Sequence, residues 1–400
     1  MKSIIFLGDG MADRPLAALN GKTPLEVCAT PAMDEIARRG ASGTFKTLPD
    51  GLPTSSDVAN MSVLGLDPGR NYPGRGPIEA VSQQIDLSGD CVAWRCNLVT
   101  VSYPDAVLRD YSAGHIDPEE ARRLMELLQK ELGSEKVEFH SGVSYRNLLV
   151  LRGSEFAAEI NYFKPDSSQD IPVAELRLSP AADNEKVRHT IEFVEDICAK
   201  AHNILAAAGS TATDIWPWSP GRSPRIPQFS ELYGGRKGAI VSAVDVIKGI
   251  GKCAGMEVIE VDGATGFIDT NYAGKAEAAV KALENNDFVY VHVEAVDECS
   301  HLGDLKLKMR AIEDFDSKLI APVMEALKDR DDVCFAVLPD HPVPIEMREH
   351  TTEPVPFAVC GPHIAADSVT SYSEKDAQAG SLGNLCMDEL MYKILGMNRK

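Results

Sequence analysis

The chain has 400 residues, of which 44% are hydrophobic and 25% are charged, a composition typical of a globular protein with a large core. Its 60 acidic and 40 basic residues give a formal net charge of −20, and a field of that sign repels nucleic acids and anionic membranes. The 9 cysteines include no CxxC pair, so a disulfide framework is not expected and a cytoplasmic location is. The length indicates two to three domains.

The N-terminal segment predicts neither a leader nor a membrane anchor. Its apolar stretch ends at Asp9 and is shorter than the core of a signal peptide. Elsewhere, no run approaches the roughly 18 apolar residues that cross a membrane. Residues 3–7 therefore read as a buried strand of the folded protein.

The elements after this first strand are a helix, a loop, a second helix and a second loop. Residues 31–40 begin with proline and end with glycine, as short helices do. Residues 43–55 are rich in Gly, Pro, Thr and Ser and predict a loop, and a new helix begins near Ser56. Residues 67–77 are dense in Gly, Pro and Arg, and we expect a loop there too.

The middle of the chain has a different pattern. Residues 91–111 look strand-like, 119–133 form an amphipathic helix, and 137–153 alternate and then end in an apolar strand. A long helix is expected over 183–207. Residues 216–228 carry 4 prolines and predict a rigid loop, either a hinge or a domain boundary.

From residue 238 onward, apolar strands alternate with helices. Strands are expected at 238–244, 256–261, 287–294 and 332–340, which predicts an α/β fold with a mostly parallel sheet and helices on both faces. The strand at 3–7 fits the same sheet. We therefore predict a core made of residues 1–78 and 232–400, and a smaller α+β domain, residues 79–231, inserted into it.

Acidic and imidazole side chains follow the ends of three predicted strands. Since ligands of open α/β sheets gather beyond the carboxyl ends of the strands, these groups should converge at one edge. A single Asp in such a place is commonly a helix cap or a turn residue. Carboxylate and imidazole without thiolate suit manganese, zinc or iron(II), and the set is large enough for two ions. Its members are Asp9, Asp297, His301, Asp340, His341 and His350.

A nucleophile is expected in the loop that opens the helix at Ser56. Backbone N–H groups at a helix start can hold an anion, and a divalent cation can turn a serine hydroxyl into an attacking alkoxide. Plain N-capping by Ser55 or Ser56 is the alternative. His292 lies inside a predicted strand and is expected to be a core histidine. No GxxxxGK[ST] motif is present, so a P-loop nucleotide site is not expected.

Five motifs occur in order along the chain: GDGMADR, TSSDVANMSVLGLDP, VEAVDECSH, PDH and EHTTEPVPF. Together they resemble the 2,3-bisphosphoglycerate-independent phosphoglycerate mutases of the archaeal type, in the alkaline phosphatase superfamily. The resemblance implies an alkaline-phosphatase-like core with two divalent metal ions and no 2,3-bisphosphoglycerate. Manganese is the first expectation, with zinc, magnesium or cobalt as alternatives.

The resemblance also implies roles for individual residues. One metal ion would be held by Asp297, His301 and His350. The other would be held by Asp9, Asp340, His341 and the oxygen of Ser56. Ser56 rather than Ser55 is the implied nucleophile, because the serine of the family directly precedes an acidic residue, here Asp57. Several relatives carry His where this chain has Asn60, so Asn60 is not counted as a ligand.

A phosphorylated hydroxy acid requires cationic groups, and the planar fork of arginine supplies bidentate ones. In the family, a pair of substrate arginines falls where Arg222 and Arg225 lie in this chain. Lys275 matches a lysine that relatives direct at the phosphoryl group. Further candidates in the insert are Arg95, Arg109 and Arg146. For each arginine the alternative is a solvated surface cation.

The predicted activity is interconversion of 3-phosphoglycerate and 2-phosphoglycerate through a phosphoserine. A homoserine kinase-like phosphotransferase or a phosphatase could use the same metal site, and a non-catalytic metal-binding protein is a remote alternative. The expected partner is a small phosphorylated hydroxy acid, without nucleic acid or membrane, and a homo-oligomer is possible.

Overall fold

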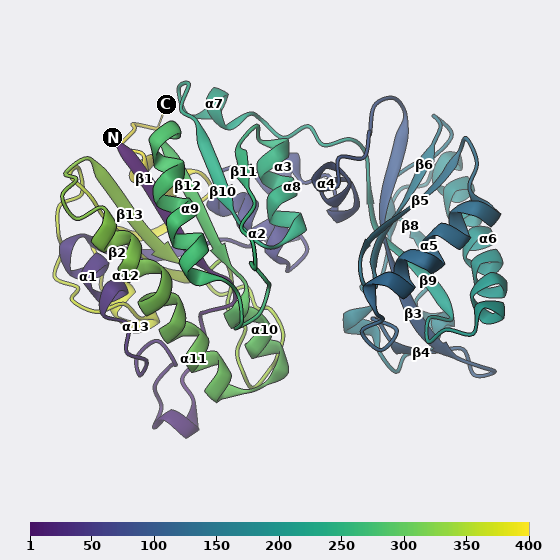
Figure 1. Cartoon of the computed structure of the whole chain (residues 1–400), viewed down its shortest axis with the longest axis horizontal. Coiled ribbons are helices and arrows are strands. Elements are labelled where there is room, and N and C mark those ends of the chain that lie inside the picture. The colour runs from purple at the N-terminus through teal and green to yellow at the C-terminus, as the bar shows by residue number, and fades with distance from the viewer. Residues whose placement is uncertain (400) are drawn as a thin grey trace. The chain divides into compact units, whose positions relative to one another are not determined.

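The computed structural model describes residues 1–399, and the chain divides into two compact units. One unit is Met1–Tyr72 with Ile226–Lys400, and the other is Pro73–Arg225 (Figure 1). The limits predicted from the sequence, after residues 78 and 231, each lie six residues further along the chain. Each unit has its own hydrophobic cluster. Across residues 1–399, no helix combines the length and the apolar character that a membrane crossing requires.

An eight-stranded sheet forms the centre of the first unit, in the order β11-β10-β12-β1-β13-β14-β2-β15. Only β14 runs antiparallel to its neighbours, β13 and β2, so the predicted mostly parallel sheet is confirmed. The strands are β1 (Lys2–Gly8), β2 (Ala41–Lys46), β10 (Gly238–Val241), β11 (Glu257–Ile259), β12 (Phe288–Val293), β13 (Val333–Leu338), β14 (Val355–Cys360) and β15 (Gly383–Cys386).

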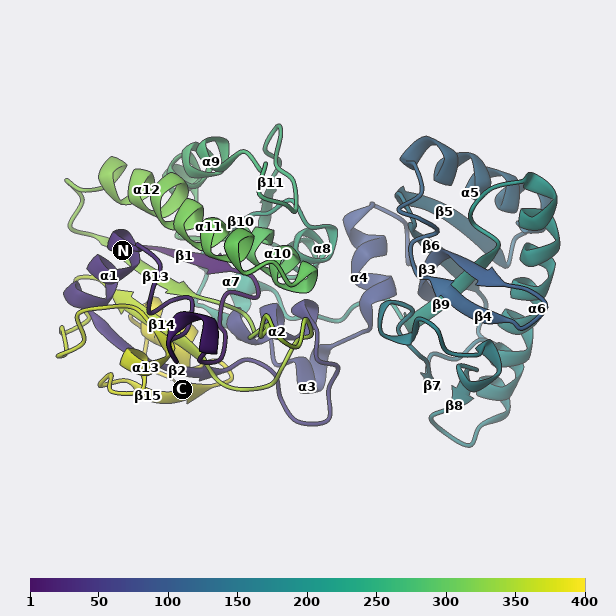
Figure 2. The ribbon, with the colours of Figure 1, turned by 90° about the horizontal axis from the view of Figure 1, so that it is seen from below.

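Helices cover both faces of this sheet, as predicted. On one face, α1, α9 and α11 share a cluster with alternate residues of β1, β12 and β13, and Figure 2 shows α9, α11 and α12 along one side of β1. On the other face, α2 reaches β12 through Asn60, and α8 packs on β10. The helices are α1 (Pro31–Arg39), α2 (Ser56–Val63), α3 (Pro68–Asn71), α7 (Phe229–Leu232), α8 (Asp245–Cys253), α9 (Tyr272–Asn285), α10 (Ala295–Leu302), α11 (Leu305–Phe315), α12 (Ala321–Ala326), α13 (Glu374–Ala377) and α14 (Glu389–Ile394).

The central strands position the site. The apolar residues of β1 are buried on both faces, as expected for a strand inside a parallel sheet. Leu7 pairs with His292 of β12 and with Leu338 of β13, so the three strands end at the same level. The residues that follow each strand therefore meet at one edge.

The second unit is an antiparallel α+β structure. β3 pairs with β4, β6 and β9, and β5 pairs with β6. Helices α5 and α6 pack on one face, where they bury Trp94 and Leu149. The elements are α4 (Arg75–Ser82), β3 (Cys91–Ser102), β4 (Val107–Asp110), α5 (Pro118–Leu132), β5 (Val137–Val143), β6 (Arg146–Arg152), β7 (Ile160–Asn161), β8 (Ser179–Pro180), α6 (Glu185–Ala208) and β9 (Asp214–Gly221).

Three predicted loops contain regular structure instead. The expected loop at 43–55 begins with the last four residues of β2, which pair with β14 and β15. The expected loop at 67–77 holds α3 and the first turn of α4. Pro68 and Pro77 lie in the first turns of these helices, where a missing N–H costs no helical bond, and Pro73 lies between the helices. The expected rigid loop at 216–228 begins with most of β9. Among the described residues β9 pairs with β3 alone, so it is an edge strand, where proline is tolerated.

Candidate active site

The end of β1 places Asp9 beside residues that follow β12 and β13. Gly10 comes next, with a φ of 64°, and a Cβ atom on it would lie 2.7 Å from the Cα of Asp297. Its N–H donates to Asp340 Oδ1 at 3.2 Å. Glycine is therefore required here both by the left-handed backbone and by the close approach of α10.

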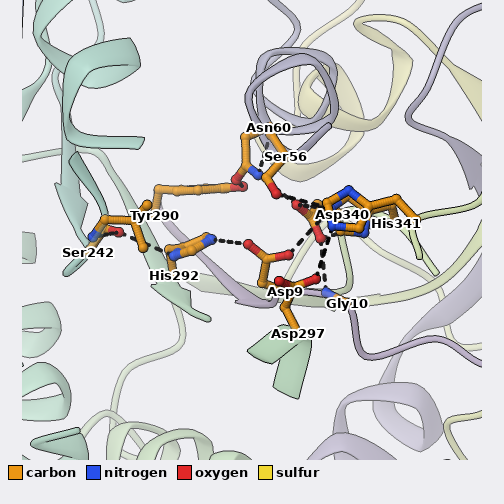
Figure 3. Close-up of polar contacts among 12 residues, drawn as sticks. Asp9, Gly10, Ser56, Asn60, Ser242, Tyr290, His292, Asp297, Asp340 and His341 are labelled. Atoms are coloured by element: carbon orange, nitrogen blue, oxygen red, sulfur yellow. Dashed lines mark hydrogen bonds and ion pairs between the residues drawn. The ribbon is translucent and has the colours of Figure 1, made fainter. Parts of the chain in front are cut away.

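The first group of candidate ligands consists of Asp9, Asp340 and His341, with Ser56 beside them (Figure 3). Both carboxylates and the imidazole are buried. His341 Nε2 lies 3.1 Å from Ser56 Oγ, 3.3 Å from Asp340 Oδ2 and 3.5 Å from Asp9 Oδ1. One ring nitrogen thus faces three oxygen atoms, more than a single N–H can serve.

The second group is Asp297, His301 and His350. The Nε2 atoms of the two imidazoles lie 3.0 Å apart, and they lie 3.3 Å and 3.4 Å from the two oxygens of Asp297. His301 donates its Nδ1 proton to the carbonyl of Arg348 at 2.8 Å, which fixes the ring with Nε2 facing the group. The ligand atoms of each group lie within 4.8 Å of one another.

The two groups adjoin each other. The rings of His341 and His350 stack with centroids 3.8 Å apart. The structure therefore brings all seven predicted metal-site residues into one region of the first unit: Asp9, Ser56, Asp297, His301, Asp340, His341 and His350.

Burial makes this cluster of carboxylates costly without a cation. Burial raises the pKa of Asp9 well above its usual value, and the nearby Asp340 and Asp297 raise it further. Burial likewise raises the pKa of Asp340, to about 7. At Asp297 burial acts in the same direction, but hydrogen bonds from His301 and His350 outweigh it and hold the pKa well below the usual value.

The donor set fits divalent metal ions. Asp9 Oδ1 is buried and makes no hydrogen bond within the described residues. Burying an oxygen without a hydrogen bond costs free energy. Asp9 Oδ1 faces His341 Nε2, which also faces oxygen atoms of Ser56 and Asp340. Carboxylate and imidazole without thiolate suit manganese or zinc better than calcium.

Two polar residues on the inner side of the site were not predicted as functional. His292, expected to be a core histidine, is buried as expected, but its Nε2 lies 2.9 Å from Asp9 Oδ2. Burial lowers the pKa of His292 to about 3, so the ring is neutral. Asn60, expected not to be a ligand, donates to Asp340 Oδ2 at 2.8 Å. The sequence signal that could have identified His292 was a histidine within a mostly apolar predicted strand.

Lys275 of α9 lies behind the same edge of the sheet. Its side chain is 1% exposed, and Nζ donates to the carbonyl of His292 at 3.1 Å. Burial lowers the pKa of Lys275 to about 8, and Glu294 partly opposes that shift. An ammonium group with few partners inside the protein is well suited to meet an anion.

The predicted substrate arginines all belong to the Pro73–Arg225 unit. Arg95 is buried and forms an ion pair with Glu79, which Arg75 also contacts at 2.7 Å. Arg75 and Arg95 both lie over the ring of Trp218, at 5.8 Å and 5.7 Å from its centroid. Arg75 was not predicted from the sequence, although the GRGP motif contains it.

The other four arginines are more exposed and do not form one group with each other. Arg109 makes ion pairs of 2.9 Å and 3.0 Å with two aspartates. Arg146 lies 4.9 Å above the ring of Tyr145 and contributes to the positive field at Glu79. Arg222 donates to the carbonyl of Phe156 at 2.8 Å, and Arg225 is exposed.

Comparison with known proteins also indicates a metalloenzyme. Residues 1–398 match the family described as the Metalloenzyme superfamily. The chain is 45% identical to the 2,3-bisphosphoglycerate-independent phosphoglycerate mutase of Methanosarcina barkeri, over 98% of each chain. It is 43% identical to the 2,3-bisphosphoglycerate-independent phosphoglycerate mutase 2 of Methanothermobacter thermautotrophicus, over 98% of this chain and 96% of that one.

Two solved structures are similar to this chain over nearly its full length. The PH0037 protein from Pyrococcus horikoshii matches with a TM-score of 0.81 and 28% identity, over 100% of this chain and 98% of that one. The cofactor-independent phosphoglycerate mutase from Thermoplasma acidophilum matches with a TM-score of 0.66 and 27% identity, over 99% of both chains. The chain therefore belongs to the 2,3-bisphosphoglycerate-independent phosphoglycerate mutases, within the metalloenzyme superfamily.

Proposed function

We propose that this chain interconverts 3-phosphoglycerate and 2-phosphoglycerate and that Ser56 carries the phosphoryl group between them. The observation behind the proposal is the position of Ser56 Oγ, 3.1 Å from His341 Nε2 and beside the candidate metal ligands. Ser55 is a poorer candidate, because its hydroxyl is buried and directed at the carbonyl of Pro53. The names of the relatives at 42% to 45% identity support the same reaction.

We assign two divalent cations to the site, with manganese as the expected metal. Asp297, His301 and His350 would hold one of them. Asp9, Asp340, His341 and Ser56 Oγ would hold the other. Bound there, the cations would lower the pKa of the Ser56 hydroxyl and offset the negative charge of the transferring group.

The side chains of the protein then have defined tasks. Ser56 Oγ loses its proton and forms a bond to phosphorus while the bond from phosphorus to the substrate oxygen breaks. The departing oxygen takes up a proton, which leaves phosphoserine and free glycerate. The other hydroxyl of the glycerate takes the phosphoryl group back and restores Ser56. The N–H groups at the start of α2 and the Lys275 ammonium favour the negative charge of the phosphoryl group.

We assign substrate recognition to the Pro73–Arg225 unit. A substrate with a carboxylate and a phosphate needs bidentate cationic donors, which this unit carries as arginines. The candidates are Arg95, Arg109, Arg146, Arg222 and Arg225. Exclusion of water while phosphoserine exists is the second requirement, since water would convert the mutase into a phosphatase.

The decisive experiment is an assay of the full chain, depleted of metal and then supplied with Mn²⁺, Zn²⁺, Mg²⁺ or Co²⁺ in turn. Formation of 2-phosphoglycerate from 3-phosphoglycerate is followed by coupling to enolase. We expect turnover with Mn²⁺ and no stimulation by 2,3-bisphosphoglycerate. Ser56→Ala should reduce kcat by at least about 10³-fold, of the order seen when a nucleophile is removed, with Mn²⁺ still bound.

Ser55→Ala is the matched control for this variant. The two serines are adjacent, and the Ser55 side chain makes no capping hydrogen bond to α2, so its loss should leave kcat within a few-fold of the parent. Parallel assays with homoserine plus ATP and with p-nitrophenyl phosphate test the kinase-like and phosphatase alternatives. Activity confined to either of these substrates, or retained in Ser56→Ala, contradicts the proposal.

A further inference from the structure

Strand β12 carries two buried polar side chains directly behind the candidate ligands. Tyr290 and His292 are two residues apart, so they lie on the same face of the strand, and both are fully buried. Figure 3 shows that one extends toward Asn60 and the other toward Asp9. Apolar residues occupy the rest of β12, so these two polar groups require an explanation.

With Asp9 ionised, as a metal ligand must be, the hydrogen bonds of His292 have one consistent direction. The backbone N–H of Val244 donates to Ser242 Oγ at 3.1 Å. Ser242 then gives its own proton to His292 Nδ1 at 3.2 Å, and the proton on Nε2 is donated to Asp9 Oδ2 at 2.9 Å. This chain of bonds fixes the tautomer of the neutral ring and uses one oxygen of Asp9, so that Oδ1 faces the metal site.

Tyr290 acts in a similar way on the second carboxylate. Asn60 donates both protons of its amide, to the carbonyl of Ser56 at 2.7 Å and to Asp340 Oδ2 at 2.8 Å. Its oxygen accepts the hydroxyl proton of Tyr290. A reversed amide would turn its oxygen toward two acceptors, the Ser56 carbonyl and Asp340 Oδ2, and the Tyr290 hydroxyl adds the third hydrogen bond that holds the amide in the observed orientation.

We propose that Tyr290 and His292 are positioning residues that set the affinity of the site formed by Asp9, Asp340 and His341 for divalent cations. They act through Asn60 and directly on Asp9, and neither contacts the substrate or the metal itself. The inference rests on the proposed assignment of Asp9 and Asp340 as metal ligands. It explains why an asparagine suffices at position 60, since there it orients a ligand instead of being one.

The test is Tyr290→Phe, which removes one hydroxyl and keeps the ring. Tyr372→Phe is the matched control, because Tyr372 is equally buried and donates to the carbonyl of Pro356 at 3.0 Å, in the same unit but outside the site. Full-length protein is depleted of metal and titrated with Mn²⁺ in a calorimeter, and its thermal unfolding is measured without metal. Each variant loses one buried hydrogen bond, so both should lower Tm by similar amounts.

Only the Tyr290 variant should weaken Mn²⁺ binding. We expect the Kd of one class of site to rise about 10- to 100-fold in Tyr290→Phe, the range found for lost hydrogen bonds behind metal ligands, and less than two-fold in Tyr372→Phe. Equal Mn²⁺ affinities in the two variants would overturn the inference while leaving the proposed function intact. Absence of Mn²⁺ binding by the parent protein would overturn both.

Substitutions at His292 provide a second test that does not depend on Tyr290→Phe being folded. His292→Phe removes the bond to Asp9, whereas His292→Gln retains an N–H that can reach it. The inference requires His292→Phe to weaken Mn²⁺ binding by at least about ten-fold and His292→Gln to recover most of that loss. Identical losses in both variants would show that the ring only fills space, and would overturn it.

Discussion

Lys275 illustrates how burial prepares a single residue for charge recognition. Its pKa of about 8 leaves it mostly protonated at neutral pH, with the carbonyl of His292 as its hydrogen-bond partner and Glu294 as the nearby charge. A proton that the protein holds weakly is stabilised when a phosphoryl dianion arrives. Lys275 is thus suited to favour the transferring group more than the empty site.

We therefore predict that kcat/KM falls as pH rises through about 8, because the deprotonated Lys275 cannot favour the phosphoryl group. The sign follows from a lysine pKa lowered by burial, with the active form on the acidic side. Lys275→Met should reduce kcat by about 10²-fold, the usual range for one charged group at a transferring phosphoryl, and remove that alkaline limb. The measurement is a pH profile of kcat/KM with Mn²⁺ saturating. An unchanged alkaline limb in the variant contradicts the role.

At this scale the sequence predicted the ligands better than the residues behind them. Asp9 and Asp340 directly follow apolar strands, and parallel strands that end together must bring such residues to one edge. Tyr290 and Asn60 meet only because β12 and α2 pack against each other, a contact that no local pattern encodes. The burial of His292 could be predicted from its strand, but its hydrogen bond to Asp9 could not, since that bond depends on β1 and β12 being neighbours.

Among the elements, α1 depends on a residue far away in the sequence. Asp316, in the π-helical turn Asp316–Ile320 after α11, accepts hydrogen bonds from the N–H groups of Ala32 and Met33, at 3.2 Å and 2.8 Å. It therefore caps the first turn of α1. Burial nonetheless raises the pKa of Asp316 to about 6, because the two N–H groups only partly offset desolvation.

This pKa predicts how stability depends on pH. Since the folded protein binds the Asp316 proton more tightly than the unfolded chain, the contribution of Asp316 to the free energy of unfolding falls as pH rises from about 4 to about 6. Asp316→Asn cannot titrate. The stability of the parent relative to this variant should therefore drop by on the order of 2 kcal/mol between pH 4 and pH 7.

Urea unfolding of both proteins, held at one metal concentration at each pH, measures this difference. The metal site contributes equally to the two proteins and cancels in the comparison. A parent that gains stability over the variant as pH rises would contradict the assignment. It would mean that the hydrogen bonds from Ala32 and Met33 outweigh the burial of the carboxylate.

The predictions for elements failed where tertiary contacts override composition. Residues 67–77 have the Gly and Pro content of a loop, yet α4 packs Ala80 against Ala93 and Leu148 and is stabilised by that burial. In the predicted loop at 216–228, Trp216 and Trp218 pair with β3 and so belong to strand β9. Strands such as β13, with continuous apolar sequence and helices on either side, were predicted well because pattern and burial agree.

At the scale of the whole molecule, the net charge of −20 and phosphate chemistry are compatible. Under the proposed assignment, cations held by the buried carboxylates Asp9, Asp297 and Asp340 would reverse the local sign, so that the site would attract a phosphate. The same cations would relieve the mutual repulsion of these carboxylates inside the first unit. On this assignment, metal binding would contribute to the stability of that unit as well as to its chemistry.

Metal removal should therefore affect the two units unequally, because each has its own core and all candidate ligands belong to one. At a free Mn²⁺ concentration 1,000 times Kd, the expected gain is about 4 kcal/mol, or up to about 10³-fold slower exchange of the most protected amides. Hydrogen exchange followed by mass spectrometry, with Mn²⁺ and with chelator, should show this gain in β1, β12 and β13 but not in β3, β6 or α5. A gain of similar size in both units would mean that they unfold together, and no gain in either would contradict the metal assignment.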